Sequence, residues 1–137
     1  LELLSSFSLD GITPFHRAAA PDRLVLHRFR GGWSSEGRLV SQSVEDLHLE
    51  RGWQGHSVNV ERFGQIGSLP ARGFFPCAAV EDTVAGVTWA AQLACAGSWQ
   101  IEAYRQGDCL ALSGGLADRE FGHWVKRLAP GERLVSP

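Results

Sequence analysis

Hydrophobic and polar residues alternate with a period of two along much of this chain. In the segment 99–104, Trp99, Ile101 and Ala103 fall on one face, and the residues between them fall on the other. The segment 87–93 repeats this alternation, which is typical of a β-strand with one buried face. Further strands are predicted over residues 1–9, 23–30, 47–50, 57–61, 73–80, 109–113, 119–128 and 133–135.

Glycine and proline separate these segments at short intervals. The turn residues at 97–98 and at 106–108 each lie between two predicted strands and indicate tight hairpins. No segment carries the capping residues and the apolar stripe of an amphipathic helix. The sequence therefore predicts an all-β fold, a supersandwich-like antiparallel β-sandwich of many short strands, in one domain that spans residues 1–137.

Charge and cysteine content narrow the function classes. Thirteen basic and fifteen acidic residues give a net charge of −2, whereas a nucleic-acid-binding module needs a clustered positive field. The sequence has no run of about 18 apolar residues, so we expect no membrane span. Cys77, Cys95 and Cys109 are widely spaced in apolar surroundings, which predicts buried thiols in a reducing, cytoplasmic setting.

The acidic and histidine residues predict no catalytic or metal centre. The neighbours Glu45-Asp46 and Glu81-Asp82 would point to opposite faces of a strand, so neither pair can flank one substrate atom. The five histidines lack the spacing of metal ligands, and we expect neither a metal nor another cofactor. His123 falls between two apolar positions of a predicted strand, which indicates a core histidine.

The chain contains five tryptophans but only one tyrosine. Aromatic rings such as indole stack on the apolar faces of sugars. Trp89, Trp99 and Trp124 occur in predicted strands and are expected in the core. Trp33 and Trp53 follow glycines in turn-like segments, where exposure is expected. These two residues are therefore our candidates for binding a carbohydrate.

A glycine-rich polar segment over residues 62–70 is the candidate functional loop. Arginine can pair with sugar hydroxyls, and an aromatic ring and an amide stand beside it. The candidate substrate-binding residues of this loop are Arg62, Phe63 and Gln65.

Two groups of motifs resemble a known enzyme family. The segments GVTW at 86–89 and GSWQIE at 97–102 are similar to a stretch in the amino-terminal domain of the family 36 glycoside hydrolases that are α-galactosidases. The closing LAPGE at 128–132, followed by SP at 136–137, is similar to the junction after which the catalytic barrel of that family begins. The family's glycine-serine-serine loop is absent, and GQIGSLP at 64–70 stands in its place.

The resemblance implies an accessory β-sandwich domain that packs beside a catalytic (β/α)₈ barrel of the same polypeptide, supports oligomerisation and lines the galactoside pocket. It also implies that the catalytic carboxylates belong to the barrel, so this chain alone is expected to be non-catalytic. Because the chain starts with leucine and contains no methionine, we expect a fragment of a larger amino-terminal domain. A sheet that lacks strands exposes an unpaired edge, which predicts a homo-oligomer.

Two other functions are consistent with the residues alone. The chain could be an independent carbohydrate-binding β-sandwich module that uses an exposed tryptophan to bind galactosides. It could also be a small complete enzyme, for which the sequence offers no set of acid, base and nucleophile.

Overall fold

The computed structural model describes residues 7–9, 23–49, 59–107 and 109–136, and it confirms the all-β prediction. Each described strand is three to eight residues long, and a short 3₁₀ turn, η2, covers Glu45–Leu47. The strands are β1 (Phe7–Leu9), β2 (Leu24–Phe29), β3 (Leu39–Ser43), β4 (Glu61–Gln65), β5 (Cys77–Asp82), β6 (Val87–Gln92), β7 (Trp99–Gln106) and β8 (Cys109–Leu116).

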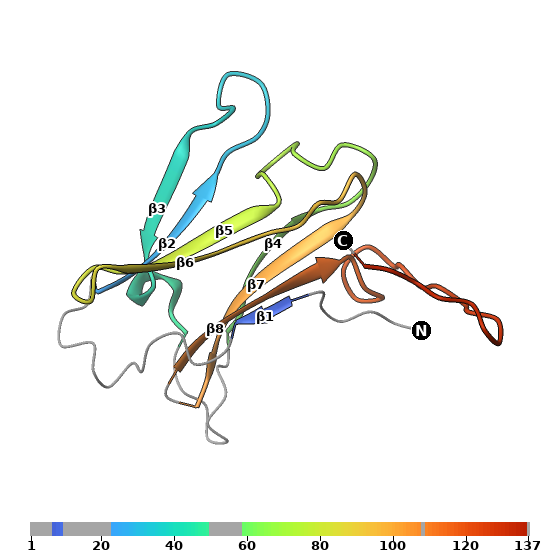
Figure 1. Ribbon diagram of the computed structural model, residues 1–137. Helices are drawn as coiled ribbons and strands as arrows, with labels where there is room; N and C mark the ends of the chain where they lie inside the picture. The colour runs from blue at the N-terminus through green and yellow to red at the C-terminus, as the bar shows by residue number, and fades with distance from the viewer. Residues whose placement is uncertain (1–6, 10–22, 50–58, 108, 137) are drawn as a thin grey trace.

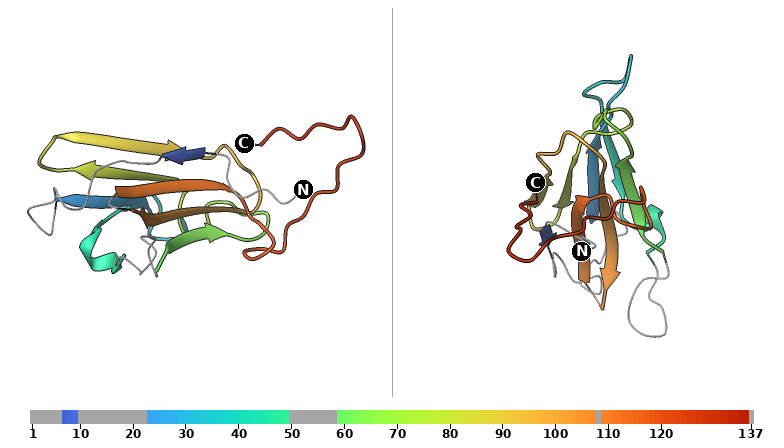
Figure 2. Two further views of the ribbon diagram at one scale, coloured as in Figure 1. Left: turned by 90° about the horizontal axis from the view of Figure 1, so that it is seen from below. Right: turned by 90° about the vertical axis from the view of Figure 1, so that its right-hand side faces the viewer.

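The strands form two antiparallel sheets of four that lie face to face (Figures 1 and 2). One sheet, called here the β7 sheet, has the order β1-β8-β7-β4. The other, the β2 sheet, has the order β3-β2-β5-β6. The antiparallel β-sandwich predicted from the alternation is therefore the observed architecture.

The core lies between the two sheets, where alternate residues of each strand point inward. Leu26 and Val80 of the β2 sheet are fully buried against Trp99, Ile101 and Leu112 of the β7 sheet. Burial of large apolar side chains on both inner faces is the main force that holds such a sandwich together. The core position predicted for Trp99 is confirmed. Trp89 is half-buried and packs against this core, whereas Trp124 is half-buried in the segment after β8.

Of the two predicted hairpins, one is confirmed. Strands β7 and β8 pair with Gln106 opposite Cys109, so the turn at Gly107 joins neighbours in one sheet. The hairpin at Gly97-Ser98 is wrong, because β6 and β7 belong to different sheets and residues 93–98 cross between them. Leu93 lies in this connection and is buried, and the gain from covering both inner faces outweighs the local turn signal.

Three predicted strands are wrong, and a fourth, over 57–61, shares only Glu61 with β4 among its described residues. In the segment 47–50, the described residues form the end of η2 and a turn at His48, whose φ of 51° lies in the left-handed region. Residues 119–136 contain no strand and run beyond the end of both sheets (Figures 1 and 2). His123 in this arm is exposed with a φ of 55°, so it is not a core histidine.

The polar segment at 62–65 is also not a loop but most of β4, which pairs with β7. Strand β3 was not predicted, because its residues Leu39–Ser43 alternate weakly and are mostly polar at the carboxyl end. The three cysteines are free and half-buried rather than fully buried.

Candidate functional site

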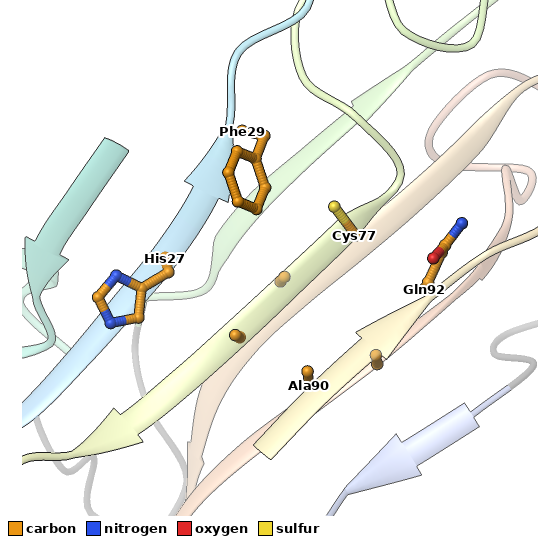
Figure 3. A pocket seen from close by; sticks show the side chains of 8 residues that line it. His27, Phe29, Cys77, Ala90 and Gln92 are labelled. Atoms are coloured by element: carbon orange, nitrogen blue, oxygen red, sulfur yellow. The ribbon is translucent and has the colours of Figure 1, made fainter. Parts of the chain in front are cut away.

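A shallow groove crosses the outer face of the β2 sheet. It consists of two adjoining pockets, of about 220 and 360 Å³, that share Phe29, Cys77 and Gln92. We call this feature the sheet groove. The rest of its first part consists of His27, Ala78, Ala79, Ala90 and Ala91, and the rest of its second part consists of Gly37, Phe75 and Pro76. Figure 3 shows the side chains of the first part, which come from three neighbouring strands, β2, β5 and β6.

Strand register explains why these residues meet. Leu26 of β2 points into the core, so His27 and Phe29 point outward. Ala79 lies opposite Ala90, and Cys77 lies opposite Gln92, in the antiparallel pairing of β5 with β6. Small side chains on two adjacent strands leave a flat floor that the larger residues border.

The imidazole of His27 is held between two polar side chains on the neighbouring strands. Its Nδ1 lies 2.9 Å from the Ser41 Oγ, and its Nε2 lies 2.9 Å from the Glu81 Oε2. In the neutral ring, Nε2 donates to the Glu81 carboxylate, and Nδ1 then accepts from the Ser41 hydroxyl. The pair of contacts fixes the orientation of the ring beside the groove.

The residue types of this cluster are those of a hydrolytic triad, but its placement favours a structural role. Ser41 lies on β3, outside the lining of both described pockets, so its hydroxyl does not face a bound substrate. We interpret the cluster as a cross-strand polar ladder. Sequence reasoning missed it because His27 is 14 residues from Ser41 and 54 from Glu81, and only the strand pairing brings the three together.

The loop between β2 and β3 holds Trp33 away from the protein, with 98% of its surface exposed. It extends from the sheets at the top of Figure 1. Within the loop, the Ser35 hydroxyl donates to the Gly31 carbonyl oxygen at 2.9 Å. The Gly31 N–H donates to the Gly73 carbonyl oxygen at 3.0 Å, which ties the loop to the segment before β5. Gly37 of the same loop lines the sheet groove.

The approach of the loop to its neighbour requires glycine. A Cβ at Gly31 would lie 1.6 Å from the carbonyl oxygen of Ala71, so no side chain fits there. The backbone at the base of the loop that carries Trp33 is therefore packed against the segment before β5.

The other substrate-binding residues predicted from the sequence do not line the sheet groove. Phe63 points into the core, where its ring meets Trp99 edge-on with centroids 5.9 Å apart. Arg62 lies on β4 of the other sheet and pairs with Glu102 and, at 3.3 Å, with Glu120.

Gln65, also on β4, donates from its Nε2 to the Ile66 carbonyl oxygen at 2.8 Å. Trp53 lies outside the described residues. Of the predicted substrate-binding residues, the structure places only Trp33 in a loop that borders the groove.

The titratable groups near the groove limit its chemistry. Burial raises the pKa of the Cys77 thiol, so the reactive thiolate is less populated near neutral pH than in a free cysteine. In the described ranges, no three His, Cys, Asp or Glu side chains are grouped so that they could hold a metal ion. The groove is therefore suited to binding an uncharged group rather than to activating a nucleophile.

The buried acids elsewhere in the described part of the chain serve the fold. The Asp82 carboxylate accepts from Arg23, with an Nη2–Oδ2 distance of 2.8 Å. Asp118 accepts from the Gln100 amide at 2.7 Å and from the Phe121 N–H at 2.6 Å. Both carboxylates accept structural hydrogen bonds from donor groups, and neither is paired with a second carboxylate.

The described residues contain no helix that is long and apolar enough to cross a membrane. No protein-family model, curated protein or solved structure matches this chain significantly.

Proposed function

We propose that this chain is an accessory β-sandwich domain of an α-galactosidase-like glycoside hydrolase. It packs against the catalytic barrel of the same polypeptide and lines part of the galactoside pocket. The supporting observation is the position of the motifs that resemble that family. The segment 86–89 leads into β6 and the segment 97–102 into β7, and these strands lie in the two facing sheets of a sandwich.

Reading the coding sequence after Pro137 is the direct test of this proposal. The expected result is a (β/α)₈ barrel with two carboxylates at the carboxyl ends of its strands. The chain by itself is expected to leave nitrophenyl galactosides unhydrolysed, while the longer polypeptide hydrolyses them. Turnover by the purified 137-residue chain would contradict the proposal.

The exposure of Trp33 favours a second candidate, an independent carbohydrate-binding module. An exposed indole offers a flat apolar surface to a sugar ring, whatever domain follows. The three free cysteines suit a reducing compartment, and we propose a cytoplasmic location for either function.

Replacing Trp33 by alanine is expected to weaken the binding of raffinose about tenfold or more, because the stacking surface is lost. Titration calorimetry of the chain measures this, with millimolar or tighter binding expected for the unchanged protein. Trp33→Tyr keeps an aromatic face and should retain most of the affinity. Equal affinities for the unchanged and the Trp33→Ala proteins would remove the loop from the binding surface.

We also propose that the chain forms a homo-oligomer through β6. This strand is uncharged, and within the described part of the chain it pairs only with β5. Its residues Val87 and Thr88 are exposed. A strand edge with these properties favours pairing with another chain.

The substitution Thr88→Lys is expected to shift the protein from dimer to monomer, because two strands that pair at this edge would bring lysine charges together. Sedimentation velocity across a range of concentrations measures the shift. Ser34→Lys, in an exposed loop, is the control and should leave the dimer intact. An unchanged protein that stays monomeric at high concentration would contradict the proposed oligomer.

A further inference from the structure

We propose that the sheet groove is a sugar-binding subsite, distinct from Trp33, that holds one neutral pyranose ring against Phe29. This inference rests on the proposed carbohydrate function but uses a different surface. Phe29 is 42% exposed and lines both pockets of the groove. Exposure of a large aromatic side chain on a strand that is otherwise well packed gives a ligand an apolar face to cover.

The shape of the groove suits a six-membered ring. Ala79 and Ala90 lie opposite each other in register, and each contributes a single methyl group to the floor. His27 and Phe29 stand on β2 on one side, and Gln92 stands on β6 on the other (Figure 3). The first pocket, of about 220 Å³, exceeds the roughly 150 Å³ of a cavity known to hold benzene.

The polar groups of the groove suit a neutral ligand with hydroxyl groups. The described lining contains no Lys, Arg, Asp or Glu side chain, so it offers no charge to bind an ion. The Gln92 amide supplies both donors and an acceptor, which match hydroxyl groups. His27 is held in one orientation by Ser41 and Glu81, so its position at the border is set before a ligand arrives. Both ring nitrogens of His27 are already engaged, so the imidazole contributes a fixed border, and the Gln92 amide is the group that can bond sugar hydroxyls beside the apolar wall.

Cys77 provides a local readout, because its side chain lines both pockets. Methyl galactoside is the probe, and the rate of alkylation of each cysteine by N-ethylmaleimide is followed by peptide mass spectrometry. Saturating sugar is expected to slow the alkylation of Cys77 at least about threefold, because occupancy of a single site excludes the reagent. Cys95, which is also half-buried but lines neither described pocket, is the internal control and should react at an unchanged rate.

Two substitutions and a matched control assign the protection to the groove. Ala90→Leu fills the floor from an exposed position and should abolish the protection, and Phe29→Ala should raise the sugar concentration needed for it about tenfold. Leu39→Ala removes an exposed apolar side chain opposite Phe29 that lines neither pocket, and it should change nothing. Protection that persists in Ala90→Leu would overturn the inference.

Sugar binding in the groove and sugar binding at Trp33 can be tested independently. Trp33→Ala is expected to retain the protection of Cys77, because its side chain is not part of the described lining. If sugar leaves the alkylation of Cys77 unchanged while Trp33-dependent binding of raffinose persists, the groove subsite is rejected and the Trp33 proposal stands. If neither is observed, both carbohydrate surfaces are rejected.

Discussion

Replacing Trp99 by alanine is expected to lower the free energy of unfolding by about 4 kcal/mol, the largest effect we predict for a single core residue. The side chain is fully buried between the sheets, and its Nε1–H donates to the Pro70 carbonyl oxygen at 2.6 Å. Truncation removes the apolar contacts with Phe63 and leaves a cavity. It also leaves the Pro70 carbonyl oxygen without its hydrogen-bond donor. Urea denaturation followed by circular dichroism measures the change.

Two variants separate packing from the hydrogen bond. Trp99→Phe keeps much of the ring but loses the bond to Pro70, so its cost should be about half that of alanine. Trp33→Ala removes an exposed indole and should change stability by less than about 0.5 kcal/mol. If Trp99→Ala costs no more than Trp33→Ala, the position of Trp99 in the core is wrong.

Replacing Asp82 by asparagine is expected to cost about 3 kcal/mol. This carboxylate is 1% exposed, accepts from the Arg23 guanidinium, and also accepts from the N–H groups of Val84 and Ala85 in the β5–β6 turn. Asparagine has nearly the same size but carries no charge, so the ion pair between Arg23 and this buried position is lost. The measurement is the free energy of unfolding at neutral pH, and Glu36→Gln, on an exposed loop, is the control.

The lowered pKa of the Asp82 carboxyl predicts how the stability of the fold depends on pH. Hydrogen bonding from Arg23, together with the backbone bonds, lowers the pKa of Asp82 to about 2, against 3.8 for a free side chain. The unfolded chain therefore takes up this proton at a higher pH than the folded chain does. The stabilisation is fully present above about pH 4 and is lost as the pH falls through about 2.

Denaturation curves between pH 2 and 6 test this dependence. The unchanged protein should lose more stability over the interval than Asp82→Asn, which lacks the titrating group. Parallel losses in the two proteins would show that other carboxylates dominate the acid sensitivity. Glu36→Gln should follow the unchanged protein, because that side chain is exposed.

Local alternation predicted the positions of β6 and β7 closely. In β7, Trp99, Ile101 and Ala103 are all fully buried, and the strand extends past the predicted end to Gln106. In β6 the alternation also predicted the strand bounds to within one residue. Both predictions succeeded because the period of side-chain orientation is a property of the extended backbone itself.

Weak or misleading local signals account for the missed elements. The glycine in segment 62–65 suggested a loop, but Gly64 lies where a Cβ would come 2.3 Å from the Trp99 carbonyl oxygen, so this strand needs glycine to pair. The apolar residues of the arm at 119–136 imitate a strand, yet no partner strand lies beside them in the described structure. Pairing depends on residues far away in the chain, which a local pattern does not contain.

The alternation of side chains was enough to predict antiparallel strands with one apolar face, because neighbouring side chains point to opposite sides of any extended segment. The sequence also pointed to Trp33 as an exposed indole, because glycines precede it at a turn. Only the tertiary structure decided that β6 and β7 separate into different sheets and that His27 meets Ser41 and Glu81. Strand partners are chosen by which arrangement buries both inner faces together, and that choice is made over the whole chain rather than within any one segment.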